Sequence, residues 1–315
     1  MHDVADLIDT SFLTDVLMGL SGRQKSIPCR WFYDDRGSEL FEDITRLAEY
    51  YPTRTETGII QDNIQAIAGF AGSEIALLEY GAGAGIKTEL LLEKMDGNCL
   101  YVPIDIAGDF LNQTVDRIRA KFPALRVRPI TSDFTIDFDI PDDVPTERRV
   151  GFFPGSTIGN LSASEARTFL GRMRRHVGRS GAAIIGVDLK KDIGTIIAAY
   201  DDSLGVTAAF NLNLLTRINR ELGGNFRPDL FEHRASWNET DGAVEMHLVS
   251  RVEQSVTLAD HRFQFEAGET IHTESSRKYD PQSFAALADG ADWVVDRTWM
   301  DADRKFAIFG LRPKS

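Results

Sequence analysis

The sequence predicts an α/β fold, a parallel sheet with helices on both faces, and three observations support this prediction. From residue 75 onward, apolar runs of strand length alternate with segments whose apolar side chains recur at helical spacing. The first run leads directly into the glycine-rich stretch 79–85, which opens a helix. Acidic side chains follow the next strands of the series. Alternation of this kind builds a parallel sheet between two layers of helices.

Helices are predicted ahead of this sheet. Residues 4–20 carry apolar side chains at helical spacing and predict an amphipathic helix. Ser38 can cap a short helix that ends at Leu47. Pro52 then interrupts the chain before a longer helix at about 55–71. These elements form an N-terminal helical cap.

The alternating region supplies the predicted sheet and its helices. Ser162 and Glu165 form a capping box at the start of its last helix. The predicted strands are 75–80, 99–104, 126–130, 150–153 and 182–187, and the predicted helices are 87–95, 107–121 and 163–178.

The pattern changes after residue 190. Residues 191–222 predict two helices, and five alternating segments with an antiparallel look follow them, at 231–237, 244–251, 254–258, 261–266 and 270–275. Asp280 and Pro281 then start a new helix, and 293–300 and 306–311 predict two closing strands. We therefore predict two domains, one made of residues 57–189 and 279–315 and the other of residues 1–56 and 190–278.

Composition narrows the class of protein. A chain of 315 residues with 43% hydrophobic content can bury a sizeable core. Its two cysteines, Cys29 and Cys99, provide no disulfide framework, which favours a reducing compartment. The N-terminus lacks a leader pattern and no apolar run approaches the roughly 20 residues that span a bilayer. We expect a cytoplasmic protein.

Charge excludes one class of partner. The formal net charge is −13, whereas proteins that bind phosphate backbones need clustered Lys and Arg. The densest basic stretch, 172–179, lies on a helical pattern and is typical of a solvated face. We expect a small-molecule substrate, no nucleic acid, no membrane and a monomer.

The glycine-rich stretch predicts a nucleotide cofactor. Gly81, Gly83 and Gly85 let backbone approach a ligand closely, at the point where a strand meets a helix. A dinucleotide fingerprint would need Gly or Ala where Ile86 stands, whereas an acidic residue before Gly-x-Gly-x-Gly is typical of S-adenosylmethionine sites. A methyltransferase is therefore predicted, with a dehydrogenase as the alternative.

Further cofactor contacts are predicted along the same sheet edge. Asp105 ends the second strand, where a carboxylate can accept from ribose hydroxyls, although it could be an exposed strand end. Asp133 and Phe134 follow the third strand and could bind adenine, or could be a helix cap and a core aromatic. Lys87, at a helix start, needs an anion such as the cofactor carboxylate, or is a solvated lysine.

Four segments carry a resemblance. They are 31–38 (WFYDDRGS), 49–56 (EYYPTRTE), 155–161 (GSTIGNL) and 271–276 (IHTESS). With them the chain resembles, over most of its length, the histidine Nα-methyltransferases that make hercynine in ergothioneine biosynthesis. The wider family includes fungal enzymes that N-methylate dimethylallyltryptophan, so a tryptophan derivative is the alternative substrate. The resemblance implies a Rossmann-like class I methyltransferase domain, residues 57–189 and 279–315, and an α+β substrate-binding domain.

The resemblance also implies site residues. Tyr33 and Tyr50 would line the substrate site, and Asn160 would hold the α-amino and carboxylate groups. Tyr200 would bind the carboxylate, and Met246 would pack nearby. One departure concerns the glycine loop, because this chain has Gly-Ala-Gly-Ala-Gly where relatives carry serine.

The resemblance places two further residues at the imidazole, Glu274 and Ser276. Glu274 could accept from an imidazole N–H and Ser276 could serve the other nitrogen, a pair that would leave an indole with an unused partner. They stand two apart on one strand, so both side chains face the same way. On spacing alone, the pair could equally be an exposed strand face.

The predicted chemistry is in-line methyl transfer to the deprotonated amine. Tyr33 and Asn160 would orient the lone pair as the catalytic residues, and no general base is identified. Aromatic faces would stabilise methylated cations. The six histidines show no metal-ligand spacing, so no metal is expected. A cofactor-binding regulatory module without catalysis is the alternative from another class.

Overall fold

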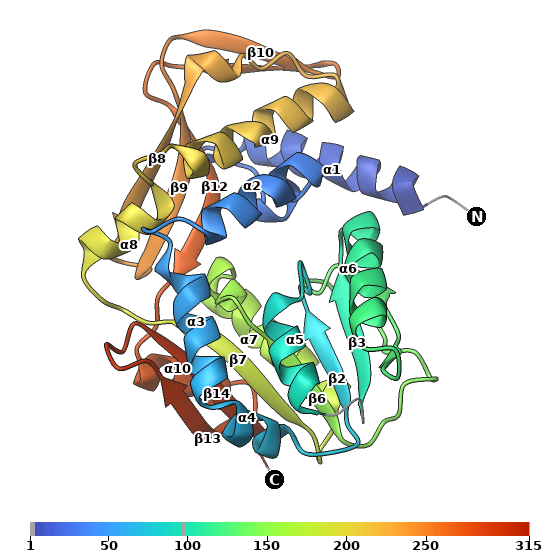
Figure 1. The fold of residues 1–315 in the computed structure, drawn as a ribbon. Coiled ribbons are helices and arrows are strands. Elements are labelled where there is room, and N and C mark those ends of the chain that lie inside the picture. The colour runs from blue at the N-terminus through green and yellow to red at the C-terminus, as the bar shows by residue number, and fades with distance from the viewer. Residues whose placement is uncertain (1–3, 96–98, 315) are drawn as a thin grey trace. The chain divides into compact units, whose positions relative to one another are not determined.

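The computed structural model describes residues 4–95 and 99–314, and the chain divides into two compact units (Figure 1). Unit 1 comprises Met1–Tyr51 and Lys191–Ser276, and unit 2 comprises Pro52–Lys190 and Arg277–Ser315. The domain boundary predicted from the sequence placed residues 52–56 in the domain made of residues 1–56 and 190–278. They fall in unit 2 instead, because a single helix, α3 (Tyr51–Asp62), continues unbroken through them.

Unit 2 contains the predicted parallel sheet, now seen to have eight strands. The order is β13-β14-β7-β6-β2-β3-β4, with β5 also paired to β3. Pairing is parallel from β7 to β4, whereas β14 runs antiparallel to β7 and β13 antiparallel to β14. The strands are β2 (Ala76–Tyr80), β3 (Leu100–Asp105), β4 (Arg126–Val127), β5 (Ile130–Thr131), β6 (Arg149–Phe153), β7 (Ala182–Asp188), β13 (Trp293–Met300) and β14 (Phe306–Pro313).

Both faces of this sheet are buried. In β2, Ala76, Leu78 and Tyr80 belong to one core cluster, whereas Leu77 belongs to another. Alternate side chains of a strand point to opposite faces, so two cores flank the sheet. The covering helices are α3, α4 (Ile64–Ala71), α5 (Ile86–Lys94), α6 (Gly108–Lys121), α7 (Ala163–Val177) and α10 (Pro281–Asp289), with the short helix η2 (Thr157–Asn160) after β6.

Unit 1 has its own sheet and core. Four strands lie in the order β1-β12-β9-β8, and β10 and β11 form a separate antiparallel pair. Its strands are β1 (Lys25–Ser26), β8 (Phe231–Asn238), β9 (Ala243–Ser250), β10 (Gln254–Leu258), β11 (His261–Phe265) and β12 (Thr270–Arg277). Its helices are α1 (Val4–Ser21), η1 (Cys29–Phe32), α2 (Asp35–Thr45), α8 (Ile193–Tyr200), α9 (Val206–Leu222) and η3 (Pro228–Leu230).

Several predicted element boundaries are wrong. Helix α2 starts before Ser38, because Asp34 is its cap and accepts from the Gly37 N–H at 2.7 Å. Pro52 lies in the first turn of α3, where its missing N–H costs nothing. The helix is interrupted later, at Asn63, which lies between α3 and α4. The predicted strand 126–130 is interrupted by Pro129, which cannot donate to a ladder.

The predicted helix starts at two other places are confirmed. Ser162 and Glu165 form a complete capping box on α7. Asp280 caps α10 with Pro281 in the first turn. In the described part of the chain, no helix has the length and apolar character needed to cross a lipid bilayer.

Candidate cofactor and substrate sites

The glycine loop of unit 2 has the backbone that its sequence predicts. Gly81, Gly83 and Gly85 have φ values of +68°, +48° and +63°, a region that favours glycine. A Cβ on Gly81 would lie 3.3 Å from Cε1 of Phe134. The loop therefore joins β2 to α5 through glycines, and side chains at these positions would crowd it. Such a loop suits close approach of a nucleotide cofactor.

Asp105 lies against this loop. Its Oδ2 accepts from the Gly83 N–H at 3.0 Å and its Oδ1 from the Ala107 N–H at 3.0 Å. Burial raises the pKa of this carboxyl, and the backbone N–H donors oppose that rise. The end of β3 and the glycine loop are thus brought together, as the sequence predicted for a ribose-binding carboxylate.

Phe134 reaches the loop from the segment after β5. Its ring lies next to Gly81 and packs edge-on against Phe153, with centroids 5.4 Å apart. Asp133 accepts from the N–H and the hydroxyl of Thr135 at 2.7 and 2.6 Å, which is a local turn contact. Phe134 is therefore both a core aromatic and a neighbour of the loop.

Lys87 is not a solvated lysine. Its Nζ lies 2.5 Å from Oε2 of Glu56, whose side chain is 1% exposed. Glu56 also accepts from the Gly155 N–H, at 2.8 and 3.0 Å from its two oxygens. The sequence suggested the cofactor carboxylate as one candidate anion for Lys87. The missed signal was Glu56, the last residue of the aromatic segment 49–56.

A second buried carboxylate precedes the loop. Glu79 is the penultimate residue of β2, and the hydroxyls of Thr88 and Tyr101 donate to its two oxygens. Burial raises the pKa of Glu79 to about 7, while these hydroxyls and the charge of Lys87 lower it. The acidic residue of the loop motif is thus held inside unit 2 by two hydrogen bonds.

Asn160 closes η2, in the loop after β6, and is half-buried. This loop turns through two residues with positive φ, Gly155 at +82° and Ser156 at +57°. Ser156 is buried and its hydroxyl accepts from the Asp188 N–H at 2.9 Å. Asn160 belongs to unit 2, whereas the other predicted substrate residues belong to unit 1.

Unit 1 brings five of those residues into one cluster. Tyr200 donates its hydroxyl to Oγ of Ser276 at 2.8 Å, and its ring lies edge-on to that of Tyr50, with centroids 6.2 Å apart. Burial raises the pKa of Tyr33 well above its usual value, and the next contribution comes from the charge of Glu274. Tyr33 therefore keeps its proton beside the Glu274 carboxylate.

Strand β12 turns the side chains of Glu274 and Ser276 toward the buried side. Burial alternates up to Thr273, but Glu274 is buried too, and Ser276 continues the shifted pattern. His272 and Ser275, three apart, share a hydrogen bond of 2.9 Å, which a regular strand would not allow. Such irregularities re-aim side chains. Met246 of β9 is buried in the core of this unit, and its carbonyl accepts from Thr273 at 3.0 Å.

Two residues outside the predicted set hold Tyr200. The buried imidazole of His233 lies with Nε2 at 2.8 Å from the Tyr200 carbonyl. Its Nδ1 lies 2.9 Å from Nδ2 of Asn211, which identifies Nδ1 as the acceptor and Nε2 as the donor. Burial lowers the pKa of His233. No sequence pattern links these residues, because they meet only through the packing of β8 and α9 beside α8.

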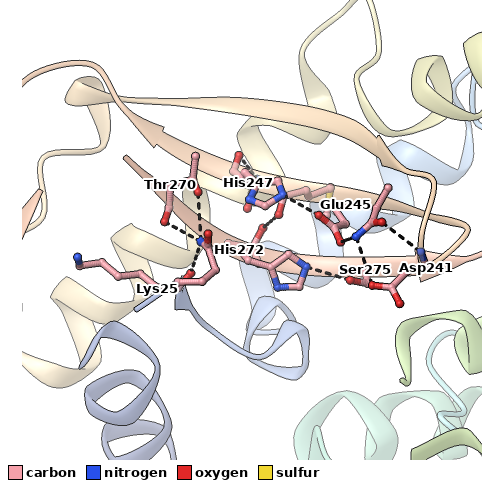
Figure 2. Close-up of polar contacts among 12 residues, drawn as sticks. Lys25, Asp241, Glu245, His247, Thr270, His272 and Ser275 are labelled. Atoms are coloured by element: carbon pink, nitrogen blue, oxygen red, sulfur yellow. Dashed lines mark hydrogen bonds and ion pairs between the residues drawn. The ribbon is translucent and has the colours of Figure 1, made fainter. Parts of the chain in front are cut away.

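The four-stranded sheet of unit 1 carries a second set of polar side chains that contact one another, shown in Figure 2. His247 lies 3.2 Å from Oε2 of Glu245, and the rings of His247 and His272 are 5.2 Å apart. Asn238 donates to the other oxygen of Glu245 at 2.7 Å. Within residues 4–95 and 99–314, no group of three or more His, Cys, Asp or Glu side chains is arranged to hold a metal ion.

Comparison with known proteins identifies the family. A family model described as histidine-specific methyltransferase, SAM-dependent, matches residues 12–313. The chain is 38% identical to a histidine N-alpha-methyltransferase of Mycolicibacterium smegmatis, over 96% of this chain and 95% of that one. It is 30% identical to ergothioneine biosynthesis protein 1 of Neurospora crassa, over 63% of this chain and 23% of that one.

A solved structure supports the same fold. An S-adenosylmethionine-dependent methyltransferase from Clostridium acetobutylicum matches with a TM-score of 0.51 at 12% identity, over 88% of this chain and 99% of that one. The predicted Rossmann-like class I fold is thus confirmed, and the dehydrogenase alternative is set aside. The chain belongs to the S-adenosylmethionine-dependent, histidine-specific methyltransferase family, which confirms the predicted methyl donor.

Proposed function

We propose that this enzyme methylates the α-amino group of L-histidine three times, giving hercynine for ergothioneine biosynthesis. The observation that carries the proposal is the buried cluster of unit 1, in which Glu274 and the hydrogen-bonded pair of Ser276 and Tyr200 lie together. Glu274 can accept from an imidazole N–H, and the hydroxyl of Ser276 can serve the other ring nitrogen. The family membership of the chain supports the same substrate.

The residues around the glycine loop fit the methyl donor. We assign the backbone of Gly81 and Gly83 to its methionine portion, Asp105 to the ribose hydroxyls, and Asp133 and Phe134 to the adenine. Lys87 would hold the carboxylate. The crowding of Gly81 by Phe134 supports this assignment, because a β-carbon there would narrow the place that a nucleotide needs. When bound, S-adenosylmethionine supplies a methyl group activated by a positively charged sulfur.

The substrate residues divide by the part of histidine that they would bind. We assign Glu274 and Ser276 to the imidazole, with Met246 packing beside it. Asn160 and Tyr200 would bind the α-amino and carboxylate groups, and Tyr33 and Tyr50 would surround the amine. Binding energy used in this way fixes the nucleophile in the geometry for attack.

The enzyme's own contribution to the chemistry is orientation. Tyr33 stays protonated, because burial and the Glu274 charge raise its pKa. A phenol that keeps its proton can position the amine lone pair without taking a charge in a buried site. The aromatic faces of Tyr33 and Tyr50 would stabilise the cationic, methylated products. We identify no general base, so deprotonation of the amine through water is part of the proposal.

We also propose that the enzyme acts on a small molecule as a cytoplasmic monomer without nucleic-acid or membrane partners. The net charge of −13 supports the absence of a nucleic-acid partner, because a phosphate backbone would be repelled. Light scattering of the purified protein at several concentrations tests the monomer. A concentration-dependent dimer would contradict it.

The test of the function is product analysis by mass spectrometry. The protein is incubated with S-adenosylmethionine and, separately, with histidine, tryptophan or dimethylallyltryptophan. We expect histidine alone to gain three methyl groups, all on the α-nitrogen by fragmentation. Methylation of an indole substrate with histidine unchanged would move the enzyme to the alternative branch. No methylation of any of them, with intact cofactor binding, would support a regulatory module.

A further inference from the structure

Glu56 joins three segments of unit 2 through one carboxylate. It stands on α3, forms an ion pair with Lys87 of α5 at 2.5 Å, and accepts from the Gly155 N–H after β6 at 2.8 and 3.0 Å. Its side chain is 1% exposed. Burying a carboxylate is costly unless it is paired and hydrogen-bonded, and here both oxygens have partners. Such a group fixes the places of its partners.

Lys87 has an electrostatic reason to need this partner. It lies in the first turn of α5, two residues after the loop residue Gly85, where the helix dipole disfavours a cation. The Glu56 carboxylate offsets that effect and holds the ammonium next to Gly155, with Nζ 3.6 Å from the position of a Cβ on that glycine. The Lys87 side chain remains 16% exposed, so a second anion can still reach it.

The loop after β6 also needs the contact with Glu56, because its backbone is strained. Gly155 and Ser156 both have positive φ, and a serine in this region is strained. Strained backbone persists only when its surroundings hold it in place. Glu56 holds the Gly155 N–H, and the Ser156 hydroxyl accepts from Asp188 at 2.9 Å. Asn160 lies in the same loop.

Gly186 of β7 makes room for the carboxylate. A Cβ on this residue would lie 1.9 Å from Oε1 of Glu56, so the end of that side chain would have to move aside. Gly186 is therefore an independent steric probe of Glu56, because an alanine there displaces the carboxylate without changing its chemistry.

We propose that Glu56 is a positioning residue for the methyl donor. Its carboxylate fixes the Lys87 ammonium for the amino-acid end of the cofactor and, through Gly155, fixes the loop that carries Asn160. The inference rests on the proposed function only where Lys87 binds the cofactor carboxylate. Cofactor binding can be measured without any methyl acceptor, so an error about histidine would leave this test unaffected.

The test compares two ligands by calorimetry. S-adenosylhomocysteine has the amino-acid end, whereas 5′-methylthioadenosine lacks it but keeps the adenosine and the thioether. In Glu56→Gln, one oxygen can still accept from Gly155 while the charge is lost. We expect the Kd of S-adenosylhomocysteine to rise about 10- to 100-fold, the range of a lost contact to a charged group, and the Kd of 5′-methylthioadenosine to stay within about twofold.

Three further sets of variants separate positioning from folding. Glu93→Gln removes a half-exposed carboxylate of α5, the helix that carries Lys87, and should leave both Kd values unchanged; Glu93 is paired with Lys121 at 2.6 Å. Lys87→Met should reproduce the selective loss, and the double variant with Glu56→Gln should lose little more, because the two residues act as one unit. Gly186→Ala should also weaken S-adenosylhomocysteine selectively, and adding the shorter Glu56→Asp should recover part of the affinity.

Three results would overturn the proposal. Glu56→Gln could leave both Kd values unchanged, or it could weaken both ligands equally, which is the pattern of a general loss of structure. Additive effects of Glu56→Gln and Lys87→Met would show that Glu56 does not act through Lys87. If Gly186→Ala does not fold, the comparison of Glu56→Gln with Glu93→Gln still decides.

Discussion

At the scale of single residues, the site is dominated by carboxylates that folding has removed from water. Glu56 is stabilised by an ammonium and a backbone N–H, whereas Glu79 has two hydroxyl donors. Hydroxyls compensate a buried charge less well than a cation does, so burial dominates and raises the pKa of Glu79 to about 7. Protonation of Glu79 can therefore change the stability of the fold near neutral pH.

The first prediction concerns the pH dependence of stability. The pKa of Glu79 is raised on folding, so between its unfolded value of 4.5 and about 7 the folded state holds a proton that the unfolded state has lost. The resulting stabilisation is present below pH 4.5 and is lost as pH rises through 7. Relative to Glu79→Gln, the wild-type free energy of unfolding should fall by on the order of 3 kcal/mol from pH 4 to pH 8.

Chemical denaturation of both proteins across this pH range measures the difference. Gln is a fair reference, because its amide can accept from the Tyr101 hydroxyl and donate to Thr88. A difference between the two proteins that is the same at every pH would show that folding does not shift the pKa of Glu79.

A second residue-scale prediction concerns Glu274. If Glu274 accepts from an imidazole N–H, Glu274→Gln keeps an acceptor but loses the charge, and Glu274→Ala loses both. We expect kcat/KM for histidine to fall about 10- to 100-fold in Glu274→Ala and less in Glu274→Gln. The KM for S-adenosylmethionine should not change. Steady-state kinetics with each substrate varied in turn would reveal an equal change in both KM values, which would argue against a specific role.

At the scale of elements, long buried strands and capped helices were predictable because their signals are local. Strands β2, β6 and β7 each contain a continuous apolar run, and α7 and α10 carry their caps in the sequence. Elements that depend on distant partners were not predictable. The two-residue strand β1 exists only because Lys25 and Ser26 pair with Ile271 and His272 of β12.

The site divides in the same way. Motif spacing alone indicated the glycine loop and Asp105, and resemblance supplied Tyr33, Tyr50, Asn160, Tyr200, Met246, Glu274 and Ser276. Their roles stay predictions. His233 and Asn211 carry no motif, because they support Tyr200 through its backbone carbonyl, and a backbone contact leaves little trace in a sequence.

The prediction at this scale concerns the end of α8. His233→Phe removes the donor to the Tyr200 carbonyl, whereas His233→Gln can replace it. We expect His233→Phe to raise the KM for histidine about tenfold, since a lost hydrogen bond of this kind is worth roughly 1 to 2 kcal/mol. His233→Gln should recover most of the affinity, with no change in the KM for S-adenosylmethionine. A failure of Gln to recover it would indicate that the imidazole matters only for packing.

At the scale of the whole molecule, the chain crosses between the two units three times, near residues 51, 190 and 276. The predicted cofactor residues lie in unit 2, and the predicted substrate residues apart from Asn160 lie in unit 1. A ligand that binds one unit should protect that unit first, because binding suppresses the local openings that expose its backbone.

Hydrogen exchange with mass spectrometry tests this division of labour. S-adenosylhomocysteine alone should protect α5 and the end of β3, and adding histidine should extend protection to α8 and β12. Protection of α8 and β12 by S-adenosylhomocysteine alone would be inconsistent with separate binding roles for the two units.

The central claim is that unit 1 recognises the two polar nitrogens of an imidazole. It is tested most directly by comparing kcat/KM for histidine with that for 2-thienylalanine, which has a five-membered aromatic ring of similar size but no ring N–H. A site built to hydrogen-bond its substrate rejects an analogue that lacks the donor by roughly 10⁴-fold, and we expect a ratio of that order. Comparable kcat/KM values for the two amino acids would show that Glu274 and Ser276 do not read the ring, and would contradict the claim.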